Sequence, residues 1–187
     1  TGSSDNDVFI TGGGSDTADG KNGSEIYLVT PTTGTTAIND TGTVGLDAAV
    51  IFGTAGDDGF AVTAGGLPGS GTVTVNGATA TLNGLESVTL DAKELLAASD
   101  TGTQDTLNLS AATVGLNANL ATGAVSGGLG TFTATDFENV VGGSAGDTLT
   151  GNGEANVITG GDGADVMSGD AGDDTFMIAA AADYDSG

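Results

Sequence analysis

The sequence contains no cysteine and no histidine. Without cysteine there is neither a disulfide nor a thiolate metal site. Without histidine the chain lacks the common zinc ligand and the usual general base, so no Ser–His or Cys–His pair for nucleophilic catalysis can be built. Two acids could in principle cleave a glycoside, but the conspicuous acids stand in a repeat that suits another role. We therefore expect that the chain is not an enzyme.

Basic residues are almost absent. Lys21 and Lys93 stand against 25 acidic residues, and the formal net charge is −23. Because phosphate neutralisation by Lys and Arg dominates nucleic-acid affinity, we expect no nucleic-acid partner. For the same reason we expect no direct binding to an anionic membrane surface. No apolar run approaches the ~20 residues that a membrane span needs, so we expect no membrane insertion.

Aromatic residues are also scarce, at 4%, while glycine reaches 35 of 187 residues. A compact chain of such charge repels itself, and the composition is also typical of disorder. Disorder in the absence of a ligand is therefore an alternative. A bound cation that neutralises carboxylates would instead favour folding. The length suits one ordinary domain or one elongated solenoid.

The C-terminal part of the chain is a repeat of nine residues. Residues 142–177 divide into the units GGSAGDTLT, GNGEANVIT, GGDGADVMS and GDAGDDTFM, and each begins with glycine. Position six holds Asp147, Asn156, Asp165 and Asp174; position eight holds Leu149, Ile158, Met167 and Phe176. Four units in one register indicate stacked structural repeats.

The same period is present, in degenerate form, at the start of the chain. Residues 2–28 read GSSDNDVFI, TGGGSDTAD and GKNGSEIYL, and a single copy, GTAGDDGFA, occupies 53–61. In these units position six holds Asp7, Asp16, Glu25 and Asp58, and position eight holds Phe9, Ala18, Tyr27 and Phe60.

The central segment has a different pattern. Residues 71–92 alternate apolar and polar side chains around Asn76-Gly77 and Asn83-Gly84, which predicts strands separated by tight turns. Residues 105–128 alternate similarly. Only the stretch 91–99, DAKELLAAS, predicts a short helix, with an aspartate able to cap it.

Pairs of threonine in the pattern Thr-x-Thr occur at 72/74, 79/81, 131/133 and 148/150. A flat threonine face that binds ice or a glycan is one interpretation. The β-propensity of threonine on an exposed strand face is the simpler one, and we favour it.

The repeat has the chemistry of a hard-cation site. Glycine tolerates positive φ, so a glycine-rich segment of six residues turns tightly with its carbonyls inward, and a closing aspartate adds a carboxylate. Calcium takes six to eight such oxygens, whereas magnesium demands a tighter octahedron. The three residues after the turn form a short strand whose middle side chain points to one side. Two units then complete one coil.

The pattern G-G-x-G-x-D-x-U-x resembles the RTX, or hemolysin-type, calcium-binding repeat. The unit GGDGADVMS has every defined residue, whereas Asp170 replaces the second glycine of the last unit, and Ala145 and Glu154 replace the fourth-position glycine of the first two. Asn156 keeps an oxygen but lacks a charge, so we expect its site to be weaker. Residues 2–28 and 53–61 resemble the repeat less closely.

The resemblance implies an all-β fold, a parallel β-roll or β-solenoid that holds calcium between turns two units apart. By position, Asp147 would share an ion with the turn that ends in Asp165, and Asn156 with the turn that ends in Asp174. Asp7 and Glu25 would cooperate in the same way, and Asp16 and Asp58 are further candidates. A solvated turn residue is the alternative for each of these acids. The implied carbonyl ligands are those of Gly142, Ser144, Gly151, Gly153, Gly160, Asp162, Gly169 and Ala171.

The repeats divide the chain into degenerate units at 1–30, irregular coils at 31–141 and the C-terminal array at 142–187, which we expect to form one elongated domain. The chain begins inside a repeat without methionine and looks like a piece of a longer protein. The resemblance implies type I secretion as an unfolded chain and folding on calcium outside the cell. We expect a structural module of a bacterial surface protein, an S-layer subunit or adhesin, that self-associates or contacts neighbouring domains. The alternative is an accessory calcium domain of a secreted protease, lipase or hemolysin.

Overall fold

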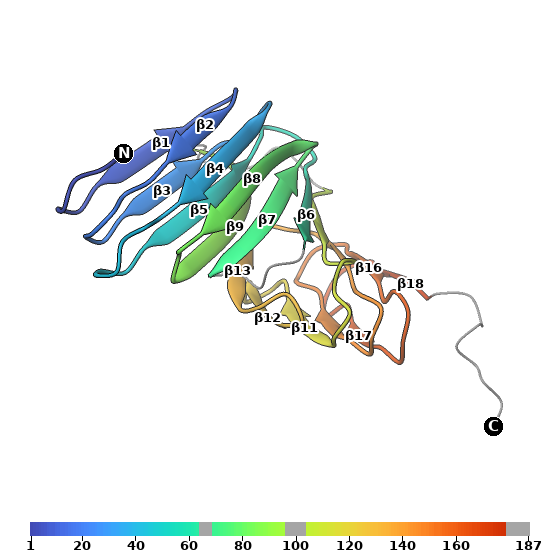
Figure 1. Cartoon of the computed structure of the whole chain (residues 1–187). Helices are drawn as coiled ribbons and strands as arrows, with labels where there is room; N and C mark the ends of the chain where they lie inside the picture. The colour runs from blue at the N-terminus through green and yellow to red at the C-terminus, as the bar shows by residue number, and fades with distance from the viewer. Residues whose placement is uncertain (64–68, 96–103, 179–187) are drawn as a thin grey trace.

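The computed structural model describes residues 1–63, 69–95 and 104–178, and these form an all-β fold of two nine-stranded sheets. Figure 1 shows the strands stacked along one direction, with β1 at one end and β17 and β18 at the other. Within the described ranges there is no helix of the length and apolar character that a bilayer crossing requires.

Most strands are short. They are β1 (Val8–Thr11), β2 (Asp16–Ala18), β3 (Ile26–Val29), β4 (Thr35–Asn39), β5 (Ala48–Gly53), β6 (Gly59–Thr63), β7 (Ser70–Val75), β8 (Ala78–Asn83), β9 (Ser87–Glu94), β10 (Thr106–Asn108), β11 (Leu116–Asn119), β12 (Ala124–Gly127), β13 (Phe132–Thr135), β14 (Asn139–Val141), β15 (Thr148–Thr150), β16 (Val157–Thr159), β17 (Val166–Ser168) and β18 (Thr175–Met177).

The chain alternates between the two sheets, whose orders are β1-β3-β5-β9-β13-β12-β11-β15-β17 and β18-β16-β14-β10-β6-β7-β8-β4-β2. Strands of successive coils pair in parallel, as β14 does with β16. Two hairpin excursions interrupt this order. The antiparallel strands β6, β7 and β8 widen one sheet, and β11, β12 and β13 widen the other. The sheets are therefore mixed, in contrast to the purely parallel arrangement expected from the repeats.

Strand register in the C-terminal array follows the nine-residue period. Asn139 pairs with Val157, which pairs with Thr175, so neighbouring strands of one sheet are two units apart. The first pair of strands has the same step, with Val8 opposite Ile26. Further along, Ile26 lies opposite Ala48, because longer turns connect these strands.

The core lies between the sheets and includes position-eight side chains of the repeats together with apolar side chains of the central strands. Tyr27, Phe60, Leu149 and Ile158 are fully buried. Phe60 packs edge-on against Phe137 with ring centroids 5.0 Å apart. Burial declines at the last coil, where Phe176 on the terminal strand β18 is 44% exposed.

The helix expected over 91–99 is wrong for residues 91–94, and residues 96–99 lie outside the described ranges. Residues 91–94 end β9, which pairs with β5 on one side and β13 on the other. Sheet hydrogen bonds on both edges and burial of Ala92 outweigh the propensity of a single helical turn, which is marginal in isolation.

Of the two Asn-Gly turns, the first is confirmed as a hairpin. Asn76 and Gly77 join β7 to β8 with φ of 49° and 91°, the two positive values of a type I′ turn. Asn83-Gly84 instead carries the chain from β8 into β9 of the other sheet.

Candidate metal centres

The glycine-rich turns of the C-terminal array stack in two columns. The turn 142–147 lies against 160–165, and the turn 151–156 lies against 169–174. A Cβ atom on Gly142 would stand 2.2 Å from the Gly160 carbonyl oxygen, and one on Gly151 would stand 2.6 Å from that of Gly169. Glycine at position one therefore permits the close stacking of coils and places main-chain oxygens between them.

The last two turns differ in conformation from the first two. Gly161 and Gly163 have φ of 91° and 112°, and Asp170 and Gly172 have 65° and 126°. The equivalent residues of the first two turns do not adopt positive φ. Because L-residues disfavour positive φ, Ala145 and Glu154 at the fourth position suit the first two turns, in which that position does not have positive φ. The two units that lack the fourth-position glycine are therefore the two whose turns have the different backbone conformation.

Position-six side chains close their own turns. Asp147 and Asn156 are 2% and 1% exposed. Asp147 Oδ2 accepts a hydrogen bond from the Gly143 amide at 2.6 Å, and Asn156 Oδ1 accepts one from Asn152 at 2.8 Å. Asp7 and Asp58 accept the equivalent hydrogen bond from the main-chain amide four residues earlier. The donors are the amides of Ser3 and Thr54, both at 2.7 Å.

These side chains also connect successive coils. Asp165 Oδ1 accepts a hydrogen bond from the Asp147 amide at 2.9 Å, and Asp174 Oδ1 accepts one from Asn156 at 3.0 Å. The amide nitrogen of the Asn156 side chain donates to the Glu138 carbonyl at 2.7 Å. A carboxylate could not donate there, which gives a structural reason for asparagine at this position.

In the C-terminal array, the structure places the residues expected at one site in the same column. The Ser144 amide donates a hydrogen bond to the Ala112 carbonyl at 2.9 Å, and the Asp162 amide donates one to the Gly143 carbonyl at 3.0 Å. Asp16, at the start of β2, is half-buried and lies on the edge strand of its sheet. One column contains Gly142, Ser144, Asp147, Gly160, Asp162 and Asp165; the other contains Gly151, Gly153, Asn156, Gly169, Ala171 and Asp174.

Asp58 continues the same pattern in the central segment. Its amide donates to Asp105 Oδ1 at 2.5 Å, and the Asp105 amide donates to Glu138 Oε2 at 2.9 Å. The repeat pattern did not reveal Asp105 or Glu138. Asp105 does precede the short apolar alternation of β10, as position-six acids precede their strands, and that signal could have identified it.

Glu25 lies in a buried cluster with Asp40 and Asp47, where one carboxylate oxygen of each lies within 4.8 Å of the others. The Tyr27 hydroxyl donates to Asp40 Oδ2 at 2.5 Å, and the Glu25 amide donates to Asp47 Oδ1 at 2.8 Å. Neither carboxylate oxygen of Glu25 has a hydrogen-bond partner. Burial, followed by the direct interaction with the adjacent Asp47 carboxyl and then the charges of Asp47, Asp40 and Asp7, raises the pKa of Glu25 to about 7.

The sequence pointed to Glu25 with Asp7, but not to Asp40 or Asp47. Asp47 directly precedes the apolar strand β5, as a position-six acid does. Its position was hidden because Asp47 follows Glu25 by 22 residues, whereas Asp165 follows Asp147 by 18, so the fixed period no longer marks it.

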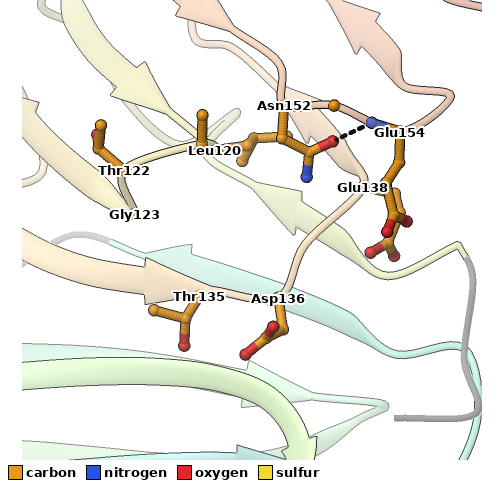
Figure 2. A pocket seen from close by; sticks show the side chains of 10 residues that line it. Leu120, Thr122, Gly123, Thr135, Asp136, Glu138, Asn152 and Glu154 are labelled. Carbon is orange, nitrogen blue, oxygen red and sulfur yellow. Dashed lines mark hydrogen bonds between the residues drawn. The ribbon is translucent and has the colours of Figure 1, made fainter. Parts of the chain in front are cut away.

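A separate surface hollow of about 570 Å³ lies where β13 and the loop after β11 meet the turn at 152–154. Figure 2 shows Asn152 accepting a hydrogen bond from the Glu154 amide at its edge, at 3.0 Å. Asp136 forms an ion pair with Lys93 at 2.7 Å, and Glu138 accepts the Asp105 amide. These acids are already engaged, and we assign no ligand to the hollow.

The profile of the RTX calcium-binding nonapeptide repeat matches the chain in four copies, within residues 1–26 and 141–176. These are the segments whose turns stack at the two ends of the fold. A comparison with curated proteins finds no match. Residues 1–26 and 141–176 thus carry RTX calcium-binding nonapeptide repeats.

Proposed function

We propose that the chain is a calcium-dependent structural module of a secreted bacterial surface protein, an S-layer subunit or adhesin, and that it folds on calcium outside the cell. The observation that carries this proposal is the stacking of RTX turns into two columns of carboxylate and carbonyl oxygens. Its role is to form and hold a surface structure, without catalysis.

Charge supports the dependence on calcium. The chain has a formal net charge of −23, and Lys21 and Lys93 are its only basic side chains. Lys21 lies 3.5 Å from Asp19, and Lys93 lies 2.7 Å from Asp136, so each is already beside another acid. Divalent cations between the coils would relieve the repulsion of the compact state. Because they bind the folded turns, they would also stabilise the fold by mass action.

Each column offers oxygen ligands of the kind calcium prefers. In the first column these are the carboxylates of Asp147 and Asp165 with nearby main-chain carbonyls. In the second they are Asn156 and Asp174, with one charge fewer. We propose that both columns bind calcium and that the second binds it more weakly.

We further propose that the underlying architecture is a parallel β-roll forming one elongated domain. The parallel register of β14, β16 and β18, two units apart, supports this. The hairpins then represent insertions, one in each sheet, that leave both sheets with nine strands. Among the described residues, β1, β2, β17 and β18 are the outer strands of their sheets, which favours self-association or contact with neighbouring domains.

The alternative is an accessory calcium domain of an exported protease, lipase or hemolysin, which the RTX match also supports. The full-length gene separates the two proposals. A neighbouring HExxH or GxSxG domain favours the accessory role, whereas ordered arrays in the electron microscope, formed only with calcium, favour the surface module.

Circular dichroism and urea unfolding test the calcium dependence. We expect a coil-to-β change on addition of calcium and a much smaller change with magnesium. Asp165→Asn with Asp174→Asn should shift the transition to higher calcium, whereas Asp5→Asn, at an exposed loop position, should not. An identical β signal in chelator would refute the proposal.

A further inference from the structure

The outer face of β1, β3 and β5 is apolar. The three strands read VFIT, IYLV and AAVIFG, without a charged residue. Tyr27 and Ile51 are fully buried in the core, so the alternate residues of these strands point outwards. The outward side chains are all hydrophobic, and they are Val8, Ile10, Ile26, Leu28, Ala48, Val50 and Phe52. We call this surface the apolar face; Figure 1 shows its strands at the N-terminal end of the molecule.

The apolar face is open to solvent. Val8, Ile10 and Ile26 are 64%, 68% and 45% exposed. The strands pair in parallel, and parallel strands that are apolar on both sides are normally covered on both faces. Here the core covers one face only. A contiguous apolar surface on a protein of this charge marks an interaction site.

The apolar face has defined limits. Strand register groups its side chains into two rows; Val8, Ile26 and Ala48 form one, and Ile10, Leu28 and Val50 form the other. On the next strand, β9, both rows become polar, because Ser87 and Thr89 lie opposite Ala48 and Val50. On the other side, β1 is the outermost strand of the sheet among the described residues. Hydrophobicity is thus confined to three strands at one end of the fold.

Charge favours a second copy of the chain as the occupant of this face. The formal net charge is −23, so two copies repel each other wherever their acidic turns meet. Two copies that meet through the apolar strands bring no carboxylate of these strands into the contact. A basic partner would instead be attracted to the acidic turns. Two sheet faces pack about 10 Å apart with their side chains interdigitated, and one patch present on both copies meets the requirement of a two-fold contact.

We propose that the apolar face is the docking surface for a second copy of this chain. Three strands about 4.8 Å apart, with four residues of about 3.3 Å each, outline about 14 by 13 Å. This is well below the ~800 Å² that each partner buries in a standard interface, so the contact is weak in solution. Several weak contacts per subunit reinforce each other in a surface lattice. The proposal deepens the self-association of the proposed function, and it rests on that function only for the folded state that calcium supports.

Sedimentation equilibrium from micromolar to millimolar protein, at saturating calcium, tests the contact. Wild type should dimerise as its concentration rises. Val8→Thr with Ile26→Thr keeps β-propensity but places four hydroxyls without partners in each dimer, so the dissociation constant should rise at least about tenfold. Val8→Thr and Val166→Thr form a matched pair, because both valines are 64% exposed and hold the seventh place of a nonapeptide unit. Only Val8→Thr should weaken the dimer.

Salt supplies a second readout that does not depend on a variant. Added sodium chloride screens the repulsion between two acidic copies and leaves an apolar contact intact. The wild-type dimer should therefore become tighter as salt is raised. A dimer that weakens with salt would be held by charged groups and would overturn the proposal.

The remaining outcomes are equally definite. A wild type that stays monomeric throughout the series overturns the proposal, as does a double variant that associates like wild type or a Val166→Thr variant that loses the dimer equally. Flotation of monomeric wild type with phosphatidylcholine vesicles would assign the face to a lipid surface instead. Far-UV circular dichroism checks that each variant folds. If wild type folds on calcium but never dimerises, this proposal alone fails; if it dimerises through this face and folds equally in chelator, the calcium dependence alone fails.

Discussion

Replacement of Gly161 by alanine should destabilise the C-terminal array, whereas the same change at Gly153 should slightly stabilise it. Gly161 has φ of 91°, and a Cβ atom there would stand 2.1 Å from the Gly143 carbonyl oxygen of the preceding coil. Gly153 does not have positive φ, and nothing lies within 4 Å of its Cβ direction. The two variants therefore separate turn conformation from the general effect of removing a glycine.

The magnitudes follow from these positions. A left-handed conformation costs an L-residue about 1–2 kcal/mol, and the overlap at Gly161 must add to this by pushing two coils apart. At Gly153 the alanine restricts only the unfolded chain, which stabilises by about 0.4–1 kcal/mol. The two variants should thus differ by at least about 1.5 kcal/mol, with opposite signs.

Urea unfolding at saturating calcium measures both variants, because the midpoint reports stability when the slope is unchanged. Equal shifts of the two midpoints in the same direction would refute the turn conformations described here. A wild-type midpoint for Gly161→Ala would show that the coils do not approach each other at this turn.

Three further results are expected. Ile158→Ala should cost about 2–5 kcal/mol in urea unfolding, because the side chain is fully buried, whereas Phe176→Ala, 44% exposed on the last strand, should cost much less. Equal losses would contradict the inward register. Asn156→Ala removes the partner of the buried Glu138 carbonyl and should cost about 1–3 kcal/mol, compared with little change for the exposed Asn117→Ala; a matching result for the two would refute the role of this amide. In chelator, the β signal should rise as the pH falls from about 7 towards 4.5, because Glu25 in the folded state binds a proton that the unfolded state releases in this window. A pH series of circular dichroism spectra measures this, and Glu25→Gln should flatten it; an unchanged pH profile in that variant would contradict the assignment.

The sequence by itself determined the C-terminal array. Its nine-residue period predicted which three residues of each unit form a strand and which side chain points inward, as Leu149 and Ile158 do. The resemblance to the RTX repeat implied that Asp147 would lie beside the turn ending in Asp165, as it does. These features depend on local chemistry: glycine where the backbone turns or coils touch, and alternation along an extended strand.

Tertiary structure alone decided the sheet order around the hairpins, the strand at residues 91–94 and the cluster of Glu25, Asp40 and Asp47. A strand's partner depends on which distant edge is free, and this outweighed the local helical pattern at 91–94. The three acids meet because turns of unequal length bring separate coils into register. Periodicity specifies where a side chain points within its own coil, but the contacts between coils specify which side chains it meets.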